Sequence, residues 1–181
     1  REEGVLAASG VLMGWPNATG VVCDIGGASL ELAYVERGLI QTSQSFELGP
    51  LTLDEYHQLE KTKTKVIKEK LSEIDNNFPN TENNFFLVGG CWRAMARIHM
   101  NLNNYQLKVL QGYKISIKSL YETIKYISST DISDISEITS SSFDRLRLLP
   151  NATKVLENLI ERFEPENIFF SGYGIREGLL Y

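Results

Sequence analysis

The chain has 181 residues, of which 43% are hydrophobic and 23% charged, and its formal net charge is −5. This composition is typical of one globular domain with a hydrophobic core, and it excludes disordered, collagen-like and coiled-coil proteins. The acidic balance argues against nucleic acid or an anionic membrane as a partner, because proteins that bind either usually carry an excess of Lys and Arg.

Helices and short strands are predicted in alternation along the chain. The first half contains a helix, three consecutive β-rich strands that suggest a meander, and one long charged helix: 2–15, 21–25, 30–35, 39–46 and 51–74. The second half contains a strand, two helices, a Ser/Thr/Asp-rich connector with one short helical turn, a helix, a strand and a glycine-bearing turn into the last segment: 85–88, 92–101, 117–127, 128–142, 152–163, 168–170 and 176–180. We therefore expect a single α/β domain over residues 1–181 in which helices and a sheet form layers.

The two cysteines, Cys23 and Cys91, each lie in an apolar segment and are predicted to be buried free thiols. No apolar run approaches the roughly 18 to 20 residues of a membrane span, and the amino end lacks the layout of a signal peptide. These features predict a cytoplasmic protein without a membrane partner. The chain begins at Arg1 without a methionine, which we interpret as the start of a piece cut from a longer protein.

Three of the predicted strands end at glycines, within 21–27, 85–90 and 168–174. Glycine-rich turns expose backbone N–H groups, and a helix that follows adds partial positive charge, so such turns can bind anions. Each turn alone is also consistent with an ordinary tight turn. Because loops at the carboxyl ends of neighbouring strands converge, we expect Gly26-Gly27 and Gly89-Gly90 to line one shared hollow.

Acidic and hydroxyl side chains accompany the first of these turns. Asp24 lies at the strand end, Ser29 follows the glycines, and Glu31 is on the same side of the next strand as Ser29. An Asp placed where phosphates arrive can hold Mg²⁺ directly or through water, and Ser29 can donate to a phosphate oxygen. The alternative is that Asp24 caps the turn and Glu31 faces solvent.

Five motifs follow one another along the chain: Glu2-Glu3-Gly4, Asp24-Ile25-Gly26-Gly27-Ala28-Ser29-Leu30-Glu31, Leu48-Gly49-Pro50, Val88-Gly89-Gly90-Cys91-Trp92-Arg93-Ala94 and Gly174-Ile175-Arg176-Glu177-Gly178. Together they resemble the Ppx/GppA family of exopolyphosphatases and guanosine pentaphosphate phosphohydrolases, within the sugar kinase/Hsp70/actin superfamily. The resemblance covers nearly the whole chain and matches the second half of the family's catalytic module. It implies a ribonuclease H-like α/β domain with a mixed sheet, in which three antiparallel strands are followed by alternating helices and strands.

The resemblance also implies roles for individual residues. Glu3 occupies the position of the base that activates or orients water, and Asp24 and Glu31 are the expected metal ligands, with Mg²⁺ as the cofactor. The expected phosphate-binding residues come from both glycine turns and from one position near the connector: Gly26, Gly27, Ser29, Gly89, Gly90, Cys91 and Arg145. No role is assigned to His57 or His99.

Three positions depart from the family's pattern. Ala28 replaces a glycine, which stiffens the loop, and Leu30 and Cys91 replace threonines. Each lost hydroxyl removes a phosphate donor worth roughly 0.5 to 1.5 kcal/mol. These departures leave open a regulatory module that binds phosphate or a nucleotide and has lost catalysis.

The function that the resemblance implies is Mg²⁺-dependent hydrolysis of the terminal phosphoanhydride of inorganic polyphosphate by the full-length parent. Its expected partners are polyphosphate or a guanosine polyphosphate and the N-terminal half of the module, which this sequence lacks, so the fragment alone is expected to be inactive. Guanosine pentaphosphate hydrolysis, the regulatory module and an ATP-dependent sugar or acetate kinase remain alternatives. The oligomeric state, including a homodimer, stays open.

Overall fold

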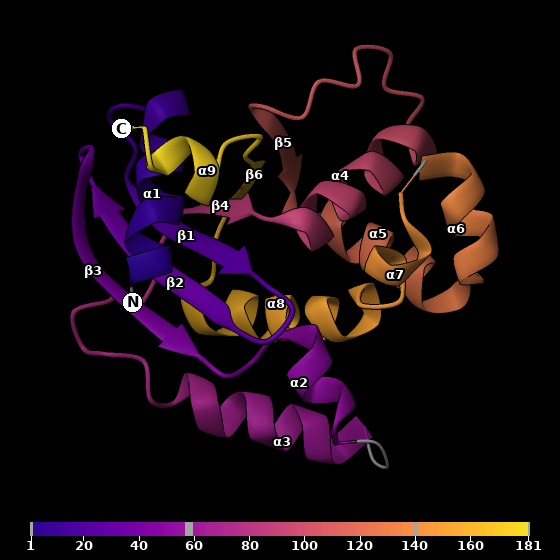
Figure 1. Ribbon diagram of the computed structural model, residues 1–181, viewed down its shortest axis with the longest axis horizontal. Coiled ribbons are helices and arrows are strands. Elements are labelled where there is room, and N and C mark those ends of the chain that lie inside the picture. Colours follow the sequence, from indigo (N-terminus) through magenta and orange to yellow (C-terminus); the bar gives the residue numbers. More distant parts are fainter. Residues whose placement is uncertain (1, 57–59, 140, 181) are drawn as a thin grey trace.

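The protein is described by a computed structural model that covers residues 2–56, 60–139 and 141–180. One six-stranded sheet, in the order β3-β2-β1-β4-β6-β5, forms its centre (Figure 1). The strands are β1 Gly20–Ile25, β2 Leu30–Glu36, β3 Leu39–Phe46, β4 Asn84–Val88, β5 Tyr113–Ser116 and β6 Asn167–Phe170. β2 runs antiparallel to both of its neighbours, β1 and β3. The strands β1, β4 and β6 are parallel to one another, and β5 pairs antiparallel with β6.

This topology confirms the predicted mixed sheet and the predicted three-strand meander. The order β3-β2-β1-β4-β6, with β2 antiparallel to the other four strands, is the ribonuclease H-like arrangement. β5 extends the sheet at one edge and was not predicted from the sequence. It has four residues and alternates buried Tyr113 and Ile115 with exposed Lys114 and Ser116, a pattern too short to identify a strand.

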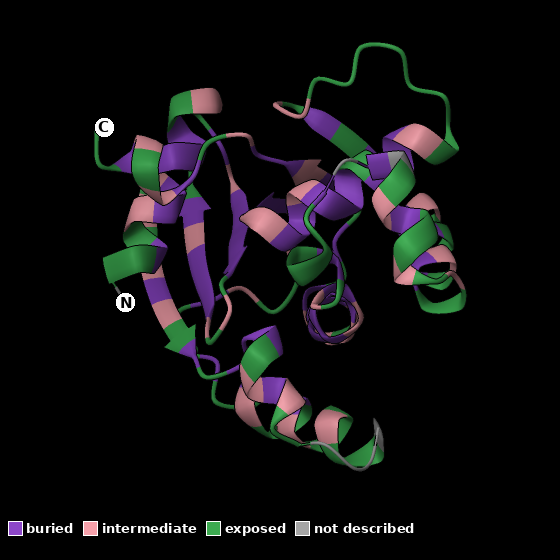
Figure 2. Cartoon of the chain, turned by 45° about the vertical axis from the view of Figure 1, so that its right-hand side comes forward, coloured by how far each residue is buried: buried purple, intermediate pink, exposed green. Residues whose placement is uncertain are grey.

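Helices cover both faces of the sheet. Their bounds are α1 Glu2–Gly14, α2 Pro50–Asp54, α3 Glu60–Leu71, α4 Gly90–Leu102, α5 Ile117–Ser129, α6 Ile132–Thr139, α7 Phe143–Leu146, α8 Leu149–Phe163 and α9 Ile175–Gly178. One face packs mainly against α1, and the other packs against α4, α5 and α8, with the buried residues concentrated along the strands between them (Figure 2). Among the described helices, none is long and apolar enough to cross a membrane.

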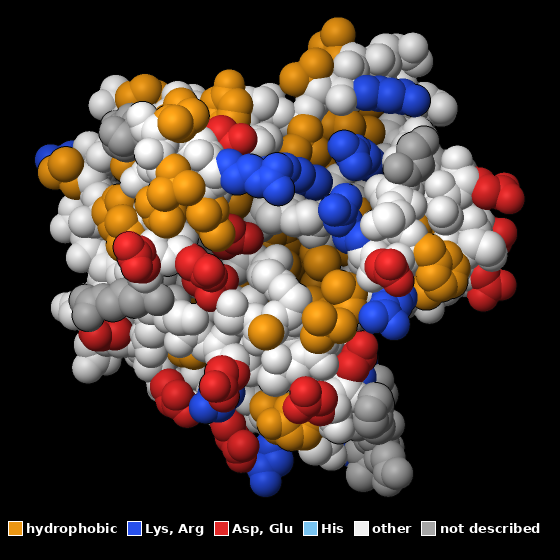
Figure 3. All heavy atoms as spheres, viewed as in Figure 1, with side chains coloured by type: hydrophobic (Ala, Val, Ile, Leu, Met, Phe, Trp, Pro, Cys, Tyr) orange, Lys and Arg blue, Asp and Glu red, His pale blue; other side chains and the backbone are white. Residues whose placement is uncertain are grey.

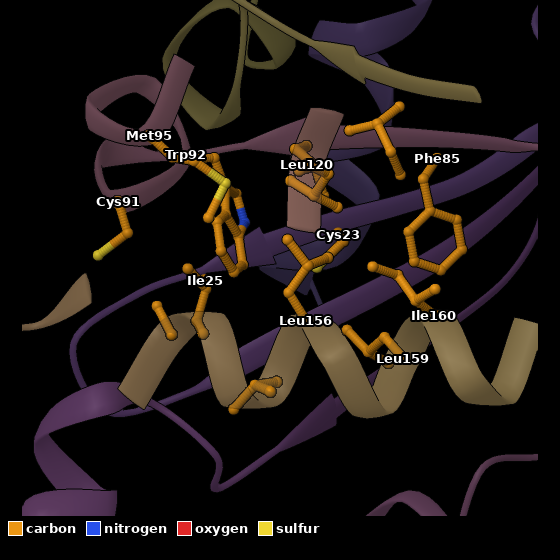
Figure 4. Close-up of a cluster of buried hydrophobic side chains, with 14 of the residues drawn as sticks. Cys23, Ile25, Phe85, Cys91, Trp92, Met95, Leu120, Leu156, Leu159 and Ile160 are labelled. Carbon is orange, nitrogen blue, oxygen red and sulfur yellow. The ribbon is translucent and has the colours of Figure 1, made fainter. Parts of the chain in front are cut away.

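The central strand β1 is buried along its whole length because both of its faces are covered. Val22 packs on the α1 side, whereas Val21, Cys23 and Ile25 point into the larger core on the other side. In that core, Cys23 and Ile25 lie with Trp92 of α4 above Leu156 of α8 (Figure 4). This packing holds the carboxyl end of β1 in place.

The prediction of one long helix over 51–74 is wrong, because two helices occupy this segment. The N–H groups of Glu55 and Tyr56 bond to carbonyls three residues back, which tightens and ends α2. Leu53 and Ile67 are both fully buried, so each helix is stabilised by its own tertiary contacts. Residues 57–59, which the prediction placed inside the helix, lie outside the described residues.

The connector over 128–142 contains more helix than predicted. The connector contains the eight-residue α6, and α7 begins directly after the connector. The hydroxyl of Thr139 donates to the carbonyl of Ile135 one turn earlier, at 2.8 Å. Ser and Thr side chains that bond back in this way fit inside a helix, although their abundance in a sequence suggests a loop.

Helices α1 and α9 approach each other so closely that only glycine fits at their contact (Figure 1). A Cβ atom on Gly10 would overlap the carbonyl of Gly174, and a Cβ on Gly178 would overlap the carbonyl of Leu6. The end of the chain is thereby held against its first helix, although the two segments are far apart in the sequence.

We predict that Gly10→Ala lowers the free energy of unfolding by about 1 to 3 kcal/mol, because the added methyl group must displace the Gly174 backbone. Thermal denaturation of the variant and the parent measures the difference. Ser9→Ala, at the neighbouring half-buried position of α1, is the matched control and should leave stability nearly unchanged. A Gly10→Ala protein as stable as the parent would contradict the close packing of α1 and α9.

Candidate functional site

The carboxyl ends of β1, β4 and β6 lie side by side at one edge of the sheet, because these strands are parallel neighbours. Each strand leads into a glycine-containing turn, at Gly26-Gly27, Gly89-Gly90 and Gly172–Gly174. The convergence of the three turns that the sequence predicted is therefore present in the fold.

A hollow of about 340 Å³ lies between the end of β4, the start of α4, α7 and α9. Among the residues that border it are Asp24, Gly89, Gly90, Arg93, Arg145 and Arg176. A second hollow of about 330 Å³ adjoins it and is bordered by Gly26, Gly27 and Cys91. Gly90 and Arg145 border both, so the two glycine pairs line adjoining hollows rather than the single hollow that was predicted.

Two carboxylates are buried together beside the first hollow. Asp24 of β1 and Glu31 of β2 are cross-strand partners in the antiparallel register, with only 7% and 4% of their surfaces exposed. Burial, followed by the nearby charge of Glu31, raises the pKa of Asp24 to about 7. The hydroxyl of Ser45 donates to Glu31 Oε1 at 3.1 Å. The alternative in which Glu31 faces solvent is therefore wrong.

Gly89 separates Asp24 from the start of α4 and has a backbone φ of +109°. A Cβ atom at this position would lie 2.6 Å from Asp24 Oδ1. Both the φ value and the close approach require glycine here. The absence of a side chain lets the first turn of α4 come next to the Asp24 carboxylate.

Three arginines from different elements surround the first hollow, and Figure 3 shows basic side chains gathered where α4, α7 and α9 meet. Arg93 Nη2 donates to the carbonyl of Gly172 at 3.0 Å, whereas its buried Nε has no hydrogen-bond partner within the described residues. Arg145, which the sequence predicted, is exposed and lies over Gly90, because a Cβ on Gly90 would be 2.8 Å from Arg145 Nε. Arg176 approaches from α9.

Arg93 and Arg176 were not predicted as site residues from the sequence, although both lie within the five motifs. Arg93 comes three residues after Gly90, so it projects from the same side of the first turn of α4. That spacing is a signal that could have identified it. Arg176 belongs to α9, which follows the turn after β6, and the packing of α9 on α1 contributes to bringing it to the hollow.

The sequence matches the family model described as the Ppx/GppA phosphatase family over residues 1–181. The chain belongs to the Ppx/GppA phosphatase family. No curated protein matches the sequence. The comparison confirms the family that the five motifs resemble.

Solved structures of Ppx/GppA proteins share this fold. The Ppx/GppA phosphatase of Aquifex aeolicus has 19% sequence identity and a TM-score of 0.81, and 99% of this chain aligns with 62% of that one. An exopolyphosphatase from Cytophaga hutchinsonii has 20% identity and a TM-score of 0.86, again with 99% of this chain and 62% of that chain covered. The chain thus spans less than two thirds of the length of these family members.

The remaining predicted site residues of this Ppx/GppA chain, Glu3 and Ser29, lie outside the two hollows. Glu3 is exposed on the first turn of α1 and does not border either hollow, but its charge contributes to raising the pKa of Asp24. The Gly26–Ser29 loop is closed by a bond from the Gly26 N–H to the Ser29 carbonyl at 2.9 Å. Ser29 is half-buried and borders neither hollow.

The three departures from the family's pattern have different consequences in the structure. In the described part of the chain, Ala28 is not among the non-glycine residues with positive φ, so it brings no backbone strain there. Leu30 is fully buried in the core. Cys91 borders the second hollow as a buried thiol whose pKa is raised to about 11 by burial. Of the three departures, Cys91 is the one at which a threonine hydroxyl of the family's pattern is missing from the wall of a hollow.

Both cysteines are buried free thiols, as the sequence predicted. His99 borders neither of the two hollows. His99 is buried and its Nδ1 lies 2.6 Å from the Tyr113 hydroxyl, whereas His57 lies outside the described residues.

The carboxylates of Asp24 and Glu31 fit a magnesium ion by their chemistry. Within the described residues there is no cluster of three or more His, Cys, Asp or Glu side chains that could hold a metal ion. Mg²⁺ is commonly held by one or two carboxylates together with waters and substrate phosphates. A cation between Asp24 and Glu31 would also offset the repulsion that raises the pKa of Asp24.

We predict that Asp24→Asn stabilises the metal-free protein at pH 8 but not at pH 4. The unfolded chain releases the Asp24 proton near pH 3.8, whereas the folded protein holds it up to about pH 7. The free energy of unfolding that protonated Asp24 contributes is therefore lost as pH rises from about 4 to 7, and it remains lost above pH 7. The gain in the free energy of unfolding at pH 8 should be on the order of 2 to 4 kcal/mol.

Thermal unfolding in the presence of EDTA at both pH values measures this effect. Asp131→Asn, at an exposed position before α6, is the matched control and should show no such pH dependence. An Asp24→Asn variant that changes stability equally at pH 4 and pH 8 would show that Asp24 titrates normally.

Proposed function

We propose that this chain forms one wall of a Mg²⁺-dependent site that hydrolyses the terminal phosphoanhydride of inorganic polyphosphate in the complete protein. The observation that carries the proposal is the hollow at the carboxyl ends of β1, β4 and β6, where Asp24 faces Arg93, Arg145 and Arg176. Family membership supports the same class of reaction.

The basic wall of the hollow suits the binding of phosphoryl oxygens. The chain as a whole carries a net charge of −5, whereas this hollow is bordered by three arginines and two acids, Asp24 and Glu177, so positive charge is in local excess there. Guanidinium groups recognise phosphate through paired N–H donors. The 13-residue helix α4 begins at Gly90 and adds unpaired backbone N–H groups at the same place.

The acidic wall suits a metal ion. We propose that Asp24, with Glu31 beside it, holds Mg²⁺. When bound, this ion would neutralise negative charge on the terminal phosphoryl group. Gly89 leaves the Asp24 carboxylate accessible from the hollow, and Ser45 orients the Glu31 carboxylate by its hydrogen bond.

We propose that Glu3 orients or activates the attacking water. Its helix packs beside the carboxylate pair: a Cβ on the neighbouring residue Gly4 would be 3.6 Å from Glu31 Cβ. Exposure leaves the Glu3 carboxylate free to approach a substrate held against the hollow. Phosphoryl transfer depends mainly on positioning and charge compensation, so the reaction needs no nucleophilic side chain from the protein.

The other wall of the site would come from the N-terminal half of the complete protein. Related structures are longer than this chain, which covers 62% of two of them. Both hollows are open to solvent, and a second half would close over the bound phosphates. We therefore expect the isolated chain to be inactive.

Guanosine pentaphosphate is the second candidate substrate. The second hollow, beside Gly26 and Gly27, adjoins the basic one and shares Arg145 with it. Its volume of about 330 Å³ offers room for a group beyond the terminal phosphates. Comparing phosphate release from polyphosphate and from guanosine pentaphosphate by the complete protein separates the two.

We predict that Glu3→Gln in the complete protein reduces phosphate release from polyphosphate by about 100-fold or more, because general-base assistance contributes at least this factor. Binding of polyphosphate should persist, since Glu3 does not border either hollow. Phosphate release and equilibrium binding are measured with Mg²⁺, and addition of EDTA should abolish turnover.

Glu2→Gln is the matched control, because Glu2 lies in the same turn of α1 and is equally an exposed carboxylate. It should retain nearly full activity. If both variants remain active, Glu3 has no role in the reaction. If the complete protein binds polyphosphate but never releases phosphate, the chain belongs to a binding module rather than a hydrolase.

A further inference from the structure

The backbone of Gly172, in the turn between β6 and α9, is held at both its N–H and its carbonyl. Its N–H donates to Gln111 Oε1 at 2.7 Å, and its carbonyl accepts from Arg93 Nη2 at 3.0 Å. Two side chains from different segments thus hold the two successive peptide groups that flank the Gly172 Cα atom. Such a backbone segment is held more firmly than one that bonds only within its own turn.

The turn that contains Gly172 determines where Arg176 lies. After Gly172 the chain passes Gly174, whose N–H donates to Glu177 Oε2 at 2.8 Å. A Cβ on Gly174 would be 2.9 Å from Val88 Cγ1, so the turn has little space in which to move toward β4. Arg176 follows directly and borders the basic hollow.

Gln111 reaches this turn from outside the hollow. It belongs to the segment between α4 and β5, which extends from the body of the molecule in Figure 1, and it borders neither of the two hollows. Its amide also lies against the end of α1, where a Cβ on Gly14 would overlap Gln111 Nε2. Gln111 therefore contacts α1 and the β6–α9 turn at the same time.

We propose that Gln111 is a positioning residue for the phosphate site: together with Arg93 it holds the Gly172 backbone, and so keeps Arg176 directed at the hollow. The inference rests on the proposed function, because it treats Arg176 as a ligand of phosphate. Arg93 combines two tasks, since it borders the hollow and holds the Gly172 carbonyl. Gln111 acts only through the turn.

The test compares Gln111→Ala with Gln111→Glu in the complete protein. Alanine removes the acceptor of the Gly172 N–H, whereas a glutamate oxygen can still accept it. Gln106→Ala is the matched control, because Gln106 lies in the same segment and is exposed, and its side chain donates to the nearby Asn104 carbonyl. One measurement is amide hydrogen exchange at Gly172 without ligand, and the other is calorimetric binding of tripolyphosphate in the presence of Mg²⁺.

We expect Gln111→Ala to accelerate exchange at Gly172 at least tenfold and to weaken tripolyphosphate binding about tenfold. Gln111→Glu and Gln106→Ala should remain within about twofold of the parent in both measurements. Glutamate restores both the packing volume and the acceptor, whereas Gln111→Met restores the volume alone, so methionine should behave like alanine if the hydrogen bond to Gly172 is what matters. If Gln111→Ala does not fold, Gly14→Ala, which pushes the Gln111 amide away from the turn, is expected to give the same two changes.

Unchanged exchange at Gly172 in Gln111→Ala would overturn the proposal, and so would faster exchange with undiminished tripolyphosphate binding. The exchange measurement needs no ligand, so it reports on the Gly172 contact whether or not the protein hydrolyses polyphosphate. A parent protein that binds no tripolyphosphate would instead refute the proposed function, and the two failures are thereby distinguished.

Discussion

The site depends on two carboxylates that the sheet buries next to each other. Asp24 and Glu31 face one another across β1 and β2, and the low polarity around them raises the pKa of Asp24. Arg93 partly offsets this effect, because its positive charge lowers the pKa of the same carboxyl. A pair of buried acids with incomplete compensation is costly in an unliganded protein, so a bound cation there would be stabilising.

Close backbone contacts allow the arginines to meet these acids. Gly89 lets α4 start beside Asp24, and Gly10 and Gly178 let α9 lie directly on α1. The first contact brings Arg93 to the hollow, and the second brings Arg176. Gly10 and Gly178, which lie outside the three glycine turns, therefore contribute to the site by setting the distance between α1 and α9.

Much of the fold was accessible from the sequence because β1, β4 and α8 have regular apolar patterns. The meander, the parallel strands and the buried cysteines were predicted correctly. The errors lie where patterns are short or polar, as in β5 and α6, and where one charged segment contains two helices, as in α2 and α3. In these segments, tertiary packing outweighs local propensity.

The sequence by itself determined the family, the strands that end in glycine-containing turns, and most of the candidate residues. These features were accessible because Asp24, Gly26, Gly89 and their neighbours occur in contiguous motifs. Only the tertiary structure decided that Glu31 is buried, that the glycine pairs border adjoining hollows, and that Arg93 and Arg176 complete the basic wall. The reason is that contiguous motifs report local backbone geometry. The distances among β2, α4 and α9 instead arise from long-range strand pairing and helix packing, which the local patterns of a sequence do not reveal.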